Sequence, residues 1–386
     1  MKKNLFAILA ILAMVAAVAP SCSNDDSNGD DQTPDATSIK GDVTSDAPMT
    51  LSAGTEWTIS GPLRVKDGGV LTIEAGATIS AAPSFYSYIL VEKGGKIMAE
   101  GTYAKPITFK STTDGAKWGG LILNGKAPVS GATYGTGSTT TEIDSDYYYG
   151  GNEPTDNSGT LTYIILKDTG ANLNGDTEHN GLTLNGVGSG TTISDIFVDA
   201  TSDDGVEFFG GTVNVTNLLV VNSDDDMFDF TEGYSGTLSN CYGIWEADYS
   251  SSEGDPSGVE ADGNLDGNNA SYVPQSNFTI EKMTIVNNAS ALDMYCAINV
   301  RRGATATISG IVKGSGNAKT LVCLAKSNGD ATTATSIKVN NSMLFTTEFD
   351  YPTGNTAASY TAMDVADALA VGCDTSVFGW TGYSFE

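Results

Sequence analysis

The sequence predicts an all-β protein folded as a right-handed parallel β-helix, a solenoid that ends in a C-terminal cap. The first observation is a repeated strand: residues 205–210 (GVEFFG) and 227–233 (MFDFTEG) are two copies of one apolar-acidic-apolar motif. The second is its recurrence with a spacing in the twenties, lengthened twice by polar insertions, at residues 181–186, 258–263 and 297–303. Such a period is typical of a coiled repeat. The third is composition, because 45 Gly in 386 residues and only 17 % charged residues indicate short strands and many turns.

The net charge and the length of the chain exclude some classes of protein. The formal net charge of −28 argues against binding nucleic acid and against electrostatic docking on anionic lipid, since both are themselves negative. An apolar content of 40 % is sufficient for a folded core. Because a solenoid lengthens by adding coils, we expect one domain over residues 51–340 rather than two globular domains.

The N-terminus is typical of a targeting segment. Residues 1–21 begin with two lysines and continue into an apolar run that is too short for a comfortable membrane span. The run ends in Ala-Pro-Ser-Cys at residues 19–22, which resembles the lipobox of bacterial lipoproteins and implies that Cys22 carries lipid. The alternative is an ordinary secreted protein with a stray cysteine.

An acidic segment follows Cys22 and predicts a flexible tether over residues 22–50. Residues 23–31 resemble the export signal that sends lipoproteins of Bacteroidetes to the outer face of the outer membrane, although a plain solvated linker has a similar composition. The resemblance implies a lipid-anchored protein that faces the cell exterior.

The predicted coils begin at residue 51. Short alternating strands separated by Gly turns occupy residues 69–79, 89–101 and 118–125. Together with residues 180–184 and the Asp-rich repeats, this run resembles a family of surface-exposed β-helix lipoproteins of Bacteroidetes, over about residues 50–310. The resemblance implies the fold and the location but no activity. Lipoproteins of this class commonly serve nutrient capture, which implies an outer-membrane transporter complex as a partner.

Two polar insertions interrupt the coils, near residues 126–160 and 246–275. Long loops in repeat proteins project from one face and often carry function. The first insertion contains Tyr147, Tyr148 and Tyr149, which could form a stacking platform for sugar rings or could simply cover the side of the β-helix. Two insertions beside one row of strands would border a cleft.

The aligned repeats also predict ladders of side chains, because equivalent strands of successive coils pair side by side. The inward positions are apolar, whereas one outward position carries three carboxylates in succession. Like charges about 5 Å apart repel by roughly 1 kcal/mol in water and roughly 3 kcal/mol at an effective dielectric of 20. We therefore expect a compensating partner for this outward ladder, which consists of Thr183, Glu207, Asp229, Glu260 and Asn299.

Calcium is one such partner, since Ca²⁺ takes roughly six to eight oxygen ligands in flexible geometry. Turns before the strands add further carboxylates to those of the ladder. The predicted metal ligands are Asp203, Asp204, Glu207, Asp225, Asp226 and Asp229. In the competing interpretation, aspartates in these turns accept hydrogen bonds from backbone amides of the neighbouring coil, which requires no ion.

Catalysis is a further hypothesis, because many parallel β-helices act on acidic polysaccharides. A glycoside hydrolase needs two or three carboxylates around the glycosidic bond, a separation that adjacent coils provide. Its residues would be Asp204, Asp226 and Asp229, with His179 as a nearby donor.

A calcium-assisted polysaccharide lyase would use Arg301 of the adjoining coil as its base. The surrounding signatures of β-helix lyases and polygalacturonases are missing from the sequence. An ion pair of Arg301 with Glu260 or Asp262 is therefore the favoured interpretation.

The C-terminal part predicts an end cap over residues 341–386, since a solenoid must cover its last open coil. Residues 363–371 could form a short helix within it. Four cysteines remain besides Cys22, and an exported protein could oxidise them in any of three pairings or keep them as buried thiols. Their spacing does not suit zinc, and they are Cys241, Cys296, Cys323 and Cys373.

These observations favour an outer-membrane lipoprotein whose β-helix binds an extended ligand, with a glycan as the best fit and Ca²⁺ as a candidate cofactor. One alternative is a calcium-assisted polysaccharide lyase or hydrolase, and another is a structural or adhesive surface protein. The predicted ligand-binding residues are Tyr147, Tyr148, Tyr149, Glu207 and Glu260.

Overall fold

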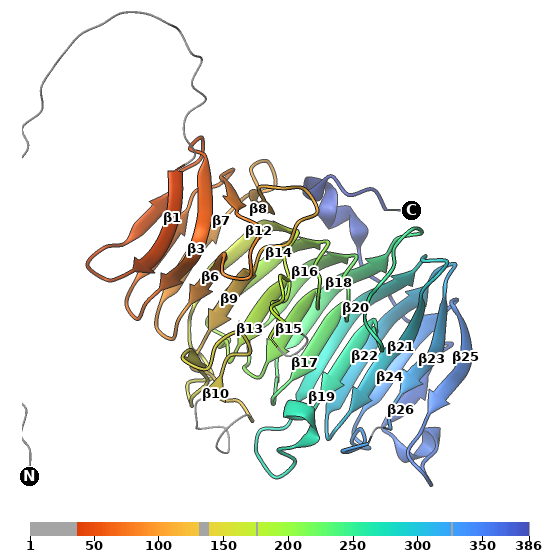
Figure 1. The fold of residues 1–386 in the computed structure, drawn as a ribbon. Helices are drawn as coiled ribbons and strands as arrows, with labels where there is room; N and C mark the ends of the chain where they lie inside the picture. The colour runs from red at the N-terminus through yellow and green to blue at the C-terminus, as the bar shows by residue number, and fades with distance from the viewer. Residues whose placement is uncertain (1–36, 131–138, 175–176, 326, 386) are drawn as a thin grey trace, which may run out of the picture. The chain divides into compact units, whose positions relative to one another are not determined.

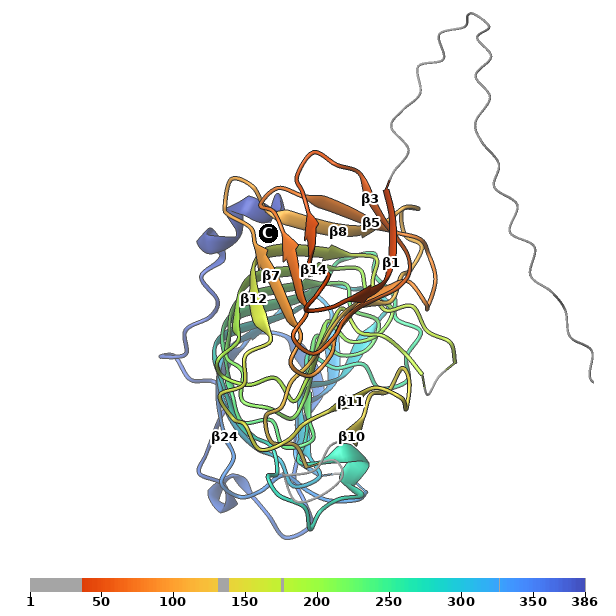
Figure 2. The ribbon, with the colours of Figure 1, turned by 90° about the vertical axis from the view of Figure 1, so that its left-hand side faces the viewer.

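The structure is a computed structural model, and it describes residues 37–130, 139–174, 177–325 and 327–385. Twenty-four of its strands form one sheet that winds into stacked coils, and strand after strand pairs in parallel with its equivalent in the next coil (Figure 1). Turned by 90°, the coils lie one behind another (Figure 2). The predicted right-handed parallel β-helix is therefore confirmed.

One face of the coil, which we call the ladder face, is a row of mostly short strands that carries the repeated motif of the sequence. Each strand pairs with its equivalents in the neighbouring coils, and only the first part of β3 also pairs with a strand of another face, residues 78–81. In order along the stack they are β1 (Thr37–Val43), β3 (Trp57–Val65), β6 (Tyr88–Val91), β9 (Gly120–Asn124), β13 (Leu182–Asn185), β15 (Val206–Phe209), β17 (Phe228–Thr231), β19 (Val259–Asp262), β21 (Asp293–Arg301), β23 (Asn317–Cys323) and β25 (Leu344–Asp350).

The other two faces share long strands that bend where one face meets the next. In the first five of these strands, one residue at the bend is left-handed, with φ between 53° and 58°: Tyr163, Asp195, Asn217, Asn240 and Lys282. Asn and Asp tolerate this conformation better than most residues. The long strands are β12 (Gly159–Lys167), β14 (Thr192–Asp199), β16 (Val215–Val221), β18 (Thr237–Trp245), β20 (Asn277–Asn287), β22 (Thr305–Lys313) and β24 (Ser336–Asn341).

Shorter elements complete the described chain. Strands on the two bent faces are β2 (Met49–Leu51), β4 (Val70–Ile73), β5 (Thr78–Ala81), β7 (Lys96–Glu100), β8 (Ile107–Ser111) and β26 (Ala362–Asp364). An antiparallel hairpin, β10 (Thr139–Thr140) and β11 (Tyr148–Tyr149), lies in the first insertion. The 3₁₀ helices are η1 (Leu265–Gly267), η2 (Ala357–Ser359) and η3 (Thr375–Thr381). Among the described residues, no helix is long and apolar enough to cross a membrane.

The core fills the inside of the coils and is apolar, as predicted. Successive rungs of one inward ladder, from Leu182 to Ile298, are almost fully buried. In a second ladder Phe208 stacks on Phe230 with ring centroids 4.9 Å apart, and Phe230 also stacks on Phe278 of β20 with ring centroids 4.3 Å apart. Stacking the coils buries this continuous core, because a single coil could not shield its apolar residues from water alone.

Glycine before some of the ladder strands allows the coils to approach closely there. A Cβ atom on Gly181 would lie 2.2 Å from the carbonyl oxygen of Gly205. A Cβ atom on Gly205 would lie 2.5 Å from the carbonyl oxygen of Met227. A larger residue at Gly181 or Gly205 would therefore have to push the neighbouring coil away, although the next copy carries Met227 at the equivalent position.

The coils extend beyond both predicted boundaries. Strands β1 and β2 lie within the predicted tether, because Ile39 and Val43 reach the core between polar neighbours. Strands β25 and β26 continue the stack past residue 341. Strand β19 divides the second insertion into two shorter loops. The signal segment and Cys22 lie outside the described residues.

The predicted end cap, residues 341–386, needs correction in its last part only: Tyr360 belongs to the main core and Tyr351 packs against it, whereas the residues around Phe378 lie along the side of the β-helix. Phe378 and Trp380 pack on outward apolar residues of β12 to β20, and Trp380 meets Tyr163 with ring centroids 5.4 Å apart. Strand β25, by contrast, pairs only with β23 among the described strands. The short helix expected at residues 363–371 is also wrong, since this stretch contains the end of β26 and turns. The last aromatic residues, from Phe378 onward, thus cover an apolar outer face.

The structure selects one cysteine pairing among those left open. Cys296 of β21 and Cys323 of β23 form a disulfide between adjacent coils. Cys241 is buried as a free thiol, and Cys373 is a half-buried free thiol.

Candidate functional site

The outward ladder predicted from the aligned repeats is confirmed by the strand register. Glu207 of β15 lies opposite Asp229 of β17, and Asp229 lies opposite Glu260 of β19. Thr183 and Asn299 occupy the same position at the two ends of the row. Three carboxylates therefore stand side by side on the ladder face.

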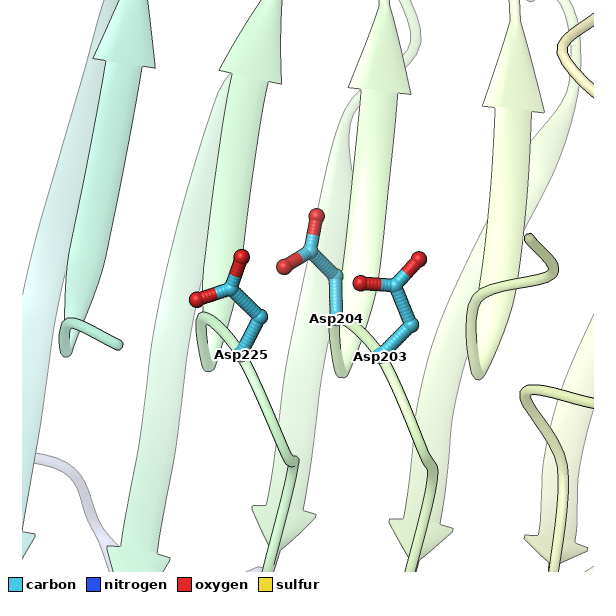
Figure 3. A group of neighbouring side chains, drawn as sticks. All are labelled: Asp203, Asp204 and Asp225. Atoms are coloured by element: carbon cyan, nitrogen blue, oxygen red, sulfur yellow. The ribbon is translucent and has the colours of Figure 1, made fainter. Parts of the chain in front are cut away.

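The turns before β15 and β17 add more carboxylates next to this row. Asp203, Asp204 and Asp225 come from neighbouring coils, and their carboxyl groups lie side by side (Figure 3). Asp204 and the neighbouring Asp226 are buried, at 5 % and 2 % exposed, whereas Asp203 and Asp225 are half-buried. Burying charge in this way is costly unless something neutralises it.

Carboxylate oxygens in this region gather in three groups, within each of which the oxygens lie no more than 4.8 Å apart. Groups 1 and 2 share Asp204, and groups 2 and 3 share Asp229, so they form one continuous band that we call the acidic cluster. All the predicted metal ligands belong to it. Group 1 is Asp203, Asp204 and Asp225; group 2 is Asp204, Glu207 and Asp229; group 3 is Asp226, Asp229 and Glu260.

Some of these carboxylates do accept hydrogen bonds from backbone amides, as the competing interpretation predicted. Asp204 Oδ1 accepts from the amide of Asp226 at 2.9 Å, and Asp226 Oδ1 accepts from the amide of Ser257 at 2.6 Å. Glu207 Oε2 accepts from the side-chain amide of Asn180 at 2.6 Å. These bonds use one oxygen of each carboxylate and leave the charges of the cluster close together.

Burial and mutual repulsion raise the pKa values throughout the acidic cluster. Burial is the main cause, followed by repulsion from neighbouring carboxylates, and together they raise the pKa of Asp204, Glu207 and Asp226 well above the usual range. The pKa of Asp225 rises to about 7. That of Asp229 rises only to about 6, because the charge of Arg301 opposes the effect of burial. The cluster favours bound protons or a bound cation.

Arg301 forms the ion pairs that the sequence favoured. Its guanidinium binds Glu260, and its Nε donates to Asp262 Oδ1 at 2.9 Å. Arg302 binds the other oxygen of Asp262. Arg301 is 5 % exposed, and its Nη1 has no hydrogen-bond partner among the described residues. One end of the acidic cluster is thus neutralised from within the protein.

His179 hydrogen-bonds to a backbone carbonyl group and not to the carboxylates, contrary to the hydrolase hypothesis. Its Nε2 donates to the carbonyl oxygen of Phe85 at 2.9 Å, and its ring packs between Phe85 and Tyr88. Burial lowers the pKa of His179 to about 4, so the ring is neutral at physiological pH. Its position in the turn was predicted, but the direction of the side chain was not.

A second feature is a cavity of about 600 Å³, which we call the tyrosine cavity. Tyr147 and Tyr148 of the first insertion meet the side chains of two coils there. The hydroxyl of Tyr147 accepts a hydrogen bond from Tyr88 at 3.2 Å and one from Arg64 at 3.5 Å. The lining consists of Arg64, Lys66, Glu92, Lys93, Asp144, Asp146, Tyr147 and Tyr148.

Tyr149 points the other way, because successive residues of a strand face opposite sides. Tyr148 is 54 % exposed, whereas Tyr149 is buried and its hydroxyl donates to Glu232 Oε2 at 2.6 Å. Tyr149 therefore fixes the hairpin instead of lining the tyrosine cavity. Glu207 and Glu260, also predicted as ligand-binding, lie in the acidic cluster and do not line the tyrosine cavity either.

The sequence analysis missed the charged side chains of the tyrosine cavity. Lys66 and Lys93 stand in the turns after β3 and β6, and the motifs VKDGG and VEKGG there are in register. Alignment of these two turns would have placed Lys66 beside Glu92, its ion-pair partner, and Lys93 one position further along the turn. Glu232 was also missed, and no pattern in the sequence marks it.

A third cavity, of about 650 Å³, covers β3, β5 and β8 near the start of the stack. Hydroxyl side chains such as Thr58, Thr78 and Ser80 dominate its lining. Its one aromatic residue, Trp57, packs partly against the core and donates its indole hydrogen to the carbonyl oxygen of Ser52. It shares no residue with the acidic cluster or the tyrosine cavity.

Fold and site together define a parallel β-helix protein with buried carboxylates and an aromatic cavity on neighbouring parts of the ladder face. A family model described as a pectate-lyase-like β-helix domain matches residues 41–383, and the chain belongs to this family. The match starts within β1 and ends after η3, in agreement with the extent of the described structure. No curated protein and no solved structure matches the chain.

Proposed function

We propose that the protein is a surface-anchored lipoprotein that binds a glycan in the tyrosine cavity and Ca²⁺ in the acidic cluster. The observation that carries the glycan part is the lining of the tyrosine cavity, which combines Tyr147 and Tyr148 with cationic and anionic side chains. Sugars present apolar ring faces and hydroxyl groups, so a site needs aromatic surface beside hydrogen-bond donors and acceptors. The tyrosine cavity offers both.

The anchor is proposed from the N-terminal sequence. Lipid on Cys22 would insert into the outer membrane, and a transporter complex of that membrane is a candidate partner for a nutrient-capturing protein. Strand β1 begins at Thr37, so the linking residues are 23–36, which is 14 residues. Fully extended, they reach at most about 50 Å. The β-helix would therefore work close to the membrane surface.

The test of the glycan part is a binding screen with a matched pair of variants. The full chain is applied to a glycan array in Ca²⁺, and the affinity for each retained glycan is measured for Tyr148→Ala and Tyr103→Ala. Tyr103 is 57 % exposed, similar to Tyr148, but lies outside the tyrosine cavity. We expect Tyr148→Ala to weaken binding about tenfold or more and Tyr103→Ala to leave it unchanged. Equal effects, or no retained glycan, would refute the proposal.

A second candidate function is a calcium-assisted polysaccharide lyase or hydrolase. The observation that favours it is the unpartnered Nη1 of Arg301 beside group 3 of the acidic cluster. Buried carboxylates next to a buried arginine could bind and activate an acidic sugar. Turnover of acidic polysaccharides that disappears in a folded Asp229→Asn variant would support this function, and absence of turnover by the wild-type protein would exclude it for the substrates tested.

A further inference from the structure

The two insertions meet beside the ladder face at a cavity of about 260 Å³, which we call the insertion cavity. The first insertion contributes Glu142 and Tyr149, and the second contributes Leu265 at the start of η1. The ladder face contributes Phe209, the last residue of β15, and Glu232, the residue after β17. The insertion cavity shares no residue with the tyrosine cavity or the acidic cluster.

Glu232 brings a carboxyl group with an unpaired oxygen to this cavity. It is 1 % exposed, and the only hydrogen bond to its side chain among the described residues comes from Tyr149, which donates to Oε2 at 2.6 Å. Its backbone is left-handed, with φ of 49°, which is unfavourable for a residue with a long side chain. Such strain persists where the surrounding structure holds it in place, and it is common at ligand sites. The fold thus holds Glu232 Oε1 without a partner at the wall of the insertion cavity.

The insertion cavity is negative and aromatic at once. None of the described residues in its lining is basic. Burial is the main cause of the raised pKa of Tyr149, and the charges that add to it all come from carboxylates, Glu232 and Glu142 among them. The rings of Tyr149 and Phe209 meet edge to face, with centroids 6.3 Å apart. A carboxylate beside aromatic rings suits a positively charged ligand, because the faces of such rings attract cations.

We propose that the insertion cavity binds an organic cation, namely a protonated amine on a small apolar group. The ammonium group lies against Glu232 Oε1, and the apolar group contacts the rings of Tyr149 and Phe209. A cavity of roughly 150 Å³ holds one benzene molecule, so the insertion cavity has room for a ring and its amine substituent. A metal ion is a poorer fit, since Ca²⁺ and Mg²⁺ need oxygen ligands all around them and the two rings occupy part of the wall. This site is separate from the glycan and Ca²⁺ sites of the proposed function.

Benzylamine, which is protonated at neutral pH, and benzyl alcohol, its neutral counterpart, form a matched pair of probes. Their binding to the full chain is measured by calorimetry at a salt concentration of about 0.15 M, which screens nonspecific attraction to the acidic surface. We expect benzylamine to bind at least about tenfold more tightly than benzyl alcohol. Equal affinities would indicate a site for neutral ligands and would overturn the proposal, as would the absence of benzylamine binding.

Glu232→Gln removes the charge and keeps an oxygen that accepts from Tyr149. It should lower the affinity for benzylamine to that for benzyl alcohol. Glu281→Gln, on the exposed side of β20, removes an acidic group outside the insertion cavity and should leave both affinities unchanged. An equal loss in the two variants would show that the amine binds the acidic surface in general, against the proposal.

Phe209→Leu gives a further measurement if Glu232→Gln does not fold, and circular dichroism checks the fold of each variant. It keeps an apolar contact and removes one ring, so it should weaken benzylamine at least about threefold and benzyl alcohol less. An equal loss for the two probes would contradict a role of the ring in holding a cation.

Proton release distinguishes Glu232 from carboxylates on the surface. Burial raises its pKa to about 7, although the hydrogen bond from Tyr149 lowers it, so the group is partly protonated at neutral pH. Glu142 and Tyr149 are the other titratable residues described in the lining, and Tyr149 stays neutral. Because an ammonium group favours ionised Glu232, calorimetry in buffers of different ionisation enthalpy should detect up to about half a proton released per benzylamine. This release should disappear in Glu232→Gln, and binding to the wild-type protein without proton release would overturn the assignment of Glu232.

Discussion

The outward ladder of the ladder face has two halves that share one backbone and differ in chemistry. After an ion pair of Asp42 and Arg64 in the first coils, this position is occupied by Leu90 and Ile122, which we call the apolar half. In the later coils it is occupied by Glu207, Asp229 and Glu260, the acidic half. The strand register continues from one half to the other without interruption. The repeat thus places apolar and acidic side chains in equivalent positions. How each side chain is stabilised depends on the residues that surround it.

The first insertion lies beside both halves and meets them differently. Ile143 and Tyr147 pack on Leu90 and Ile122, a contact that needs only the removal of apolar surface from water. Glu142, next to Ile143 in the chain, instead approaches the carboxylates of the acidic cluster. The contacts of the apolar half involve no charge, whereas the stability of the acidic half depends on what neutralises it. Its stability should therefore respond to Ca²⁺ and to pH.

The largest expected effect comes from the core that both halves share. Phe230 stacks between Phe208 and Phe278 directly inside the acidic half. Phe230→Ala should destabilise the protein by about 3–5 kcal/mol, because it leaves a cavity in a packed interior. Denaturant melts in Ca²⁺ and in EDTA should show the same loss. A loss that depends on Ca²⁺ would mean that the core and the acidic cluster are not independent.

Glu232 provides a reference for the acidic half, because it is a buried acid outside the acidic cluster. Burial raises its pKa to about 7, although the hydrogen bond from Tyr149 lowers it. A carboxyl group whose pKa is raised by folding stabilises the protein below its unfolded pKa, and this contribution is lost as pH rises to about 7 and above. Glu232→Gln keeps an acceptor for Tyr149 and cannot ionise.

The variant should therefore match the wild-type protein near pH 4 and exceed it by up to about 3 kcal/mol at pH 8, since one pKa unit corresponds to about 1.4 kcal/mol. Thermal melts across this pH range measure the difference, and the acidic cluster cancels because both proteins contain it. Glu281→Gln, on the exposed side of β20, is the matched control. A constant difference between Glu232→Gln and wild type would contradict the assignment.

Asp204 tests the acidic half directly. Asp204→Asn keeps an oxygen that can accept from the amide of Asp226 and removes a charge shared by groups 1 and 2. We expect the variant to lose the stabilisation by Ca²⁺, which for the wild-type protein is about 2.7 kcal/mol at a concentration 100 times the Kd. In EDTA it should be at least as stable as wild type, because one buried charge is gone. A variant that is less stable in EDTA would show that the carboxylate is held by backbone amides alone.

Much of the fold could be predicted because the repeat consists of short apolar strands, several of which begin with glycine. The alignment of residues 205–210 with residues 227–233 placed Glu207 beside Asp229 correctly. The ends of the stack were harder, since β1 contributes only Ile39 and Val43 to the core between polar residues. The C-terminal aromatics could not be placed, because their partners are outward residues of distant strands.

The candidate site was predictable only where it follows the repeat. The carboxylates of the acidic cluster occupy equivalent positions in successive coils, so the alignment of the repeats predicted that they lie close together. The directions of Tyr149 and His179 depend on insertions and turns that have no equivalent in other coils. The ion pair of Arg301 with Glu260 was predicted, because β19 and β21 are successive copies of the motif.

The smallest expected effect lies in the apolar half. Ile122→Val removes one methylene group beneath the hairpin, where Ile122 is 2 % exposed, and should cost about 0.5–1.5 kcal/mol. The loss should be identical in Ca²⁺ and EDTA and unchanged between pH 5 and pH 8, because no charge is involved. Thermal melts of Ile122→Val and Asp204→Asn, each in Ca²⁺ and in EDTA at pH 5 and pH 8, compare the apolar half directly with the acidic half. If Ile122→Val also responded to Ca²⁺, the hairpin would couple the two halves, and the apolar contact would itself depend on the neutralisation of the acidic cluster.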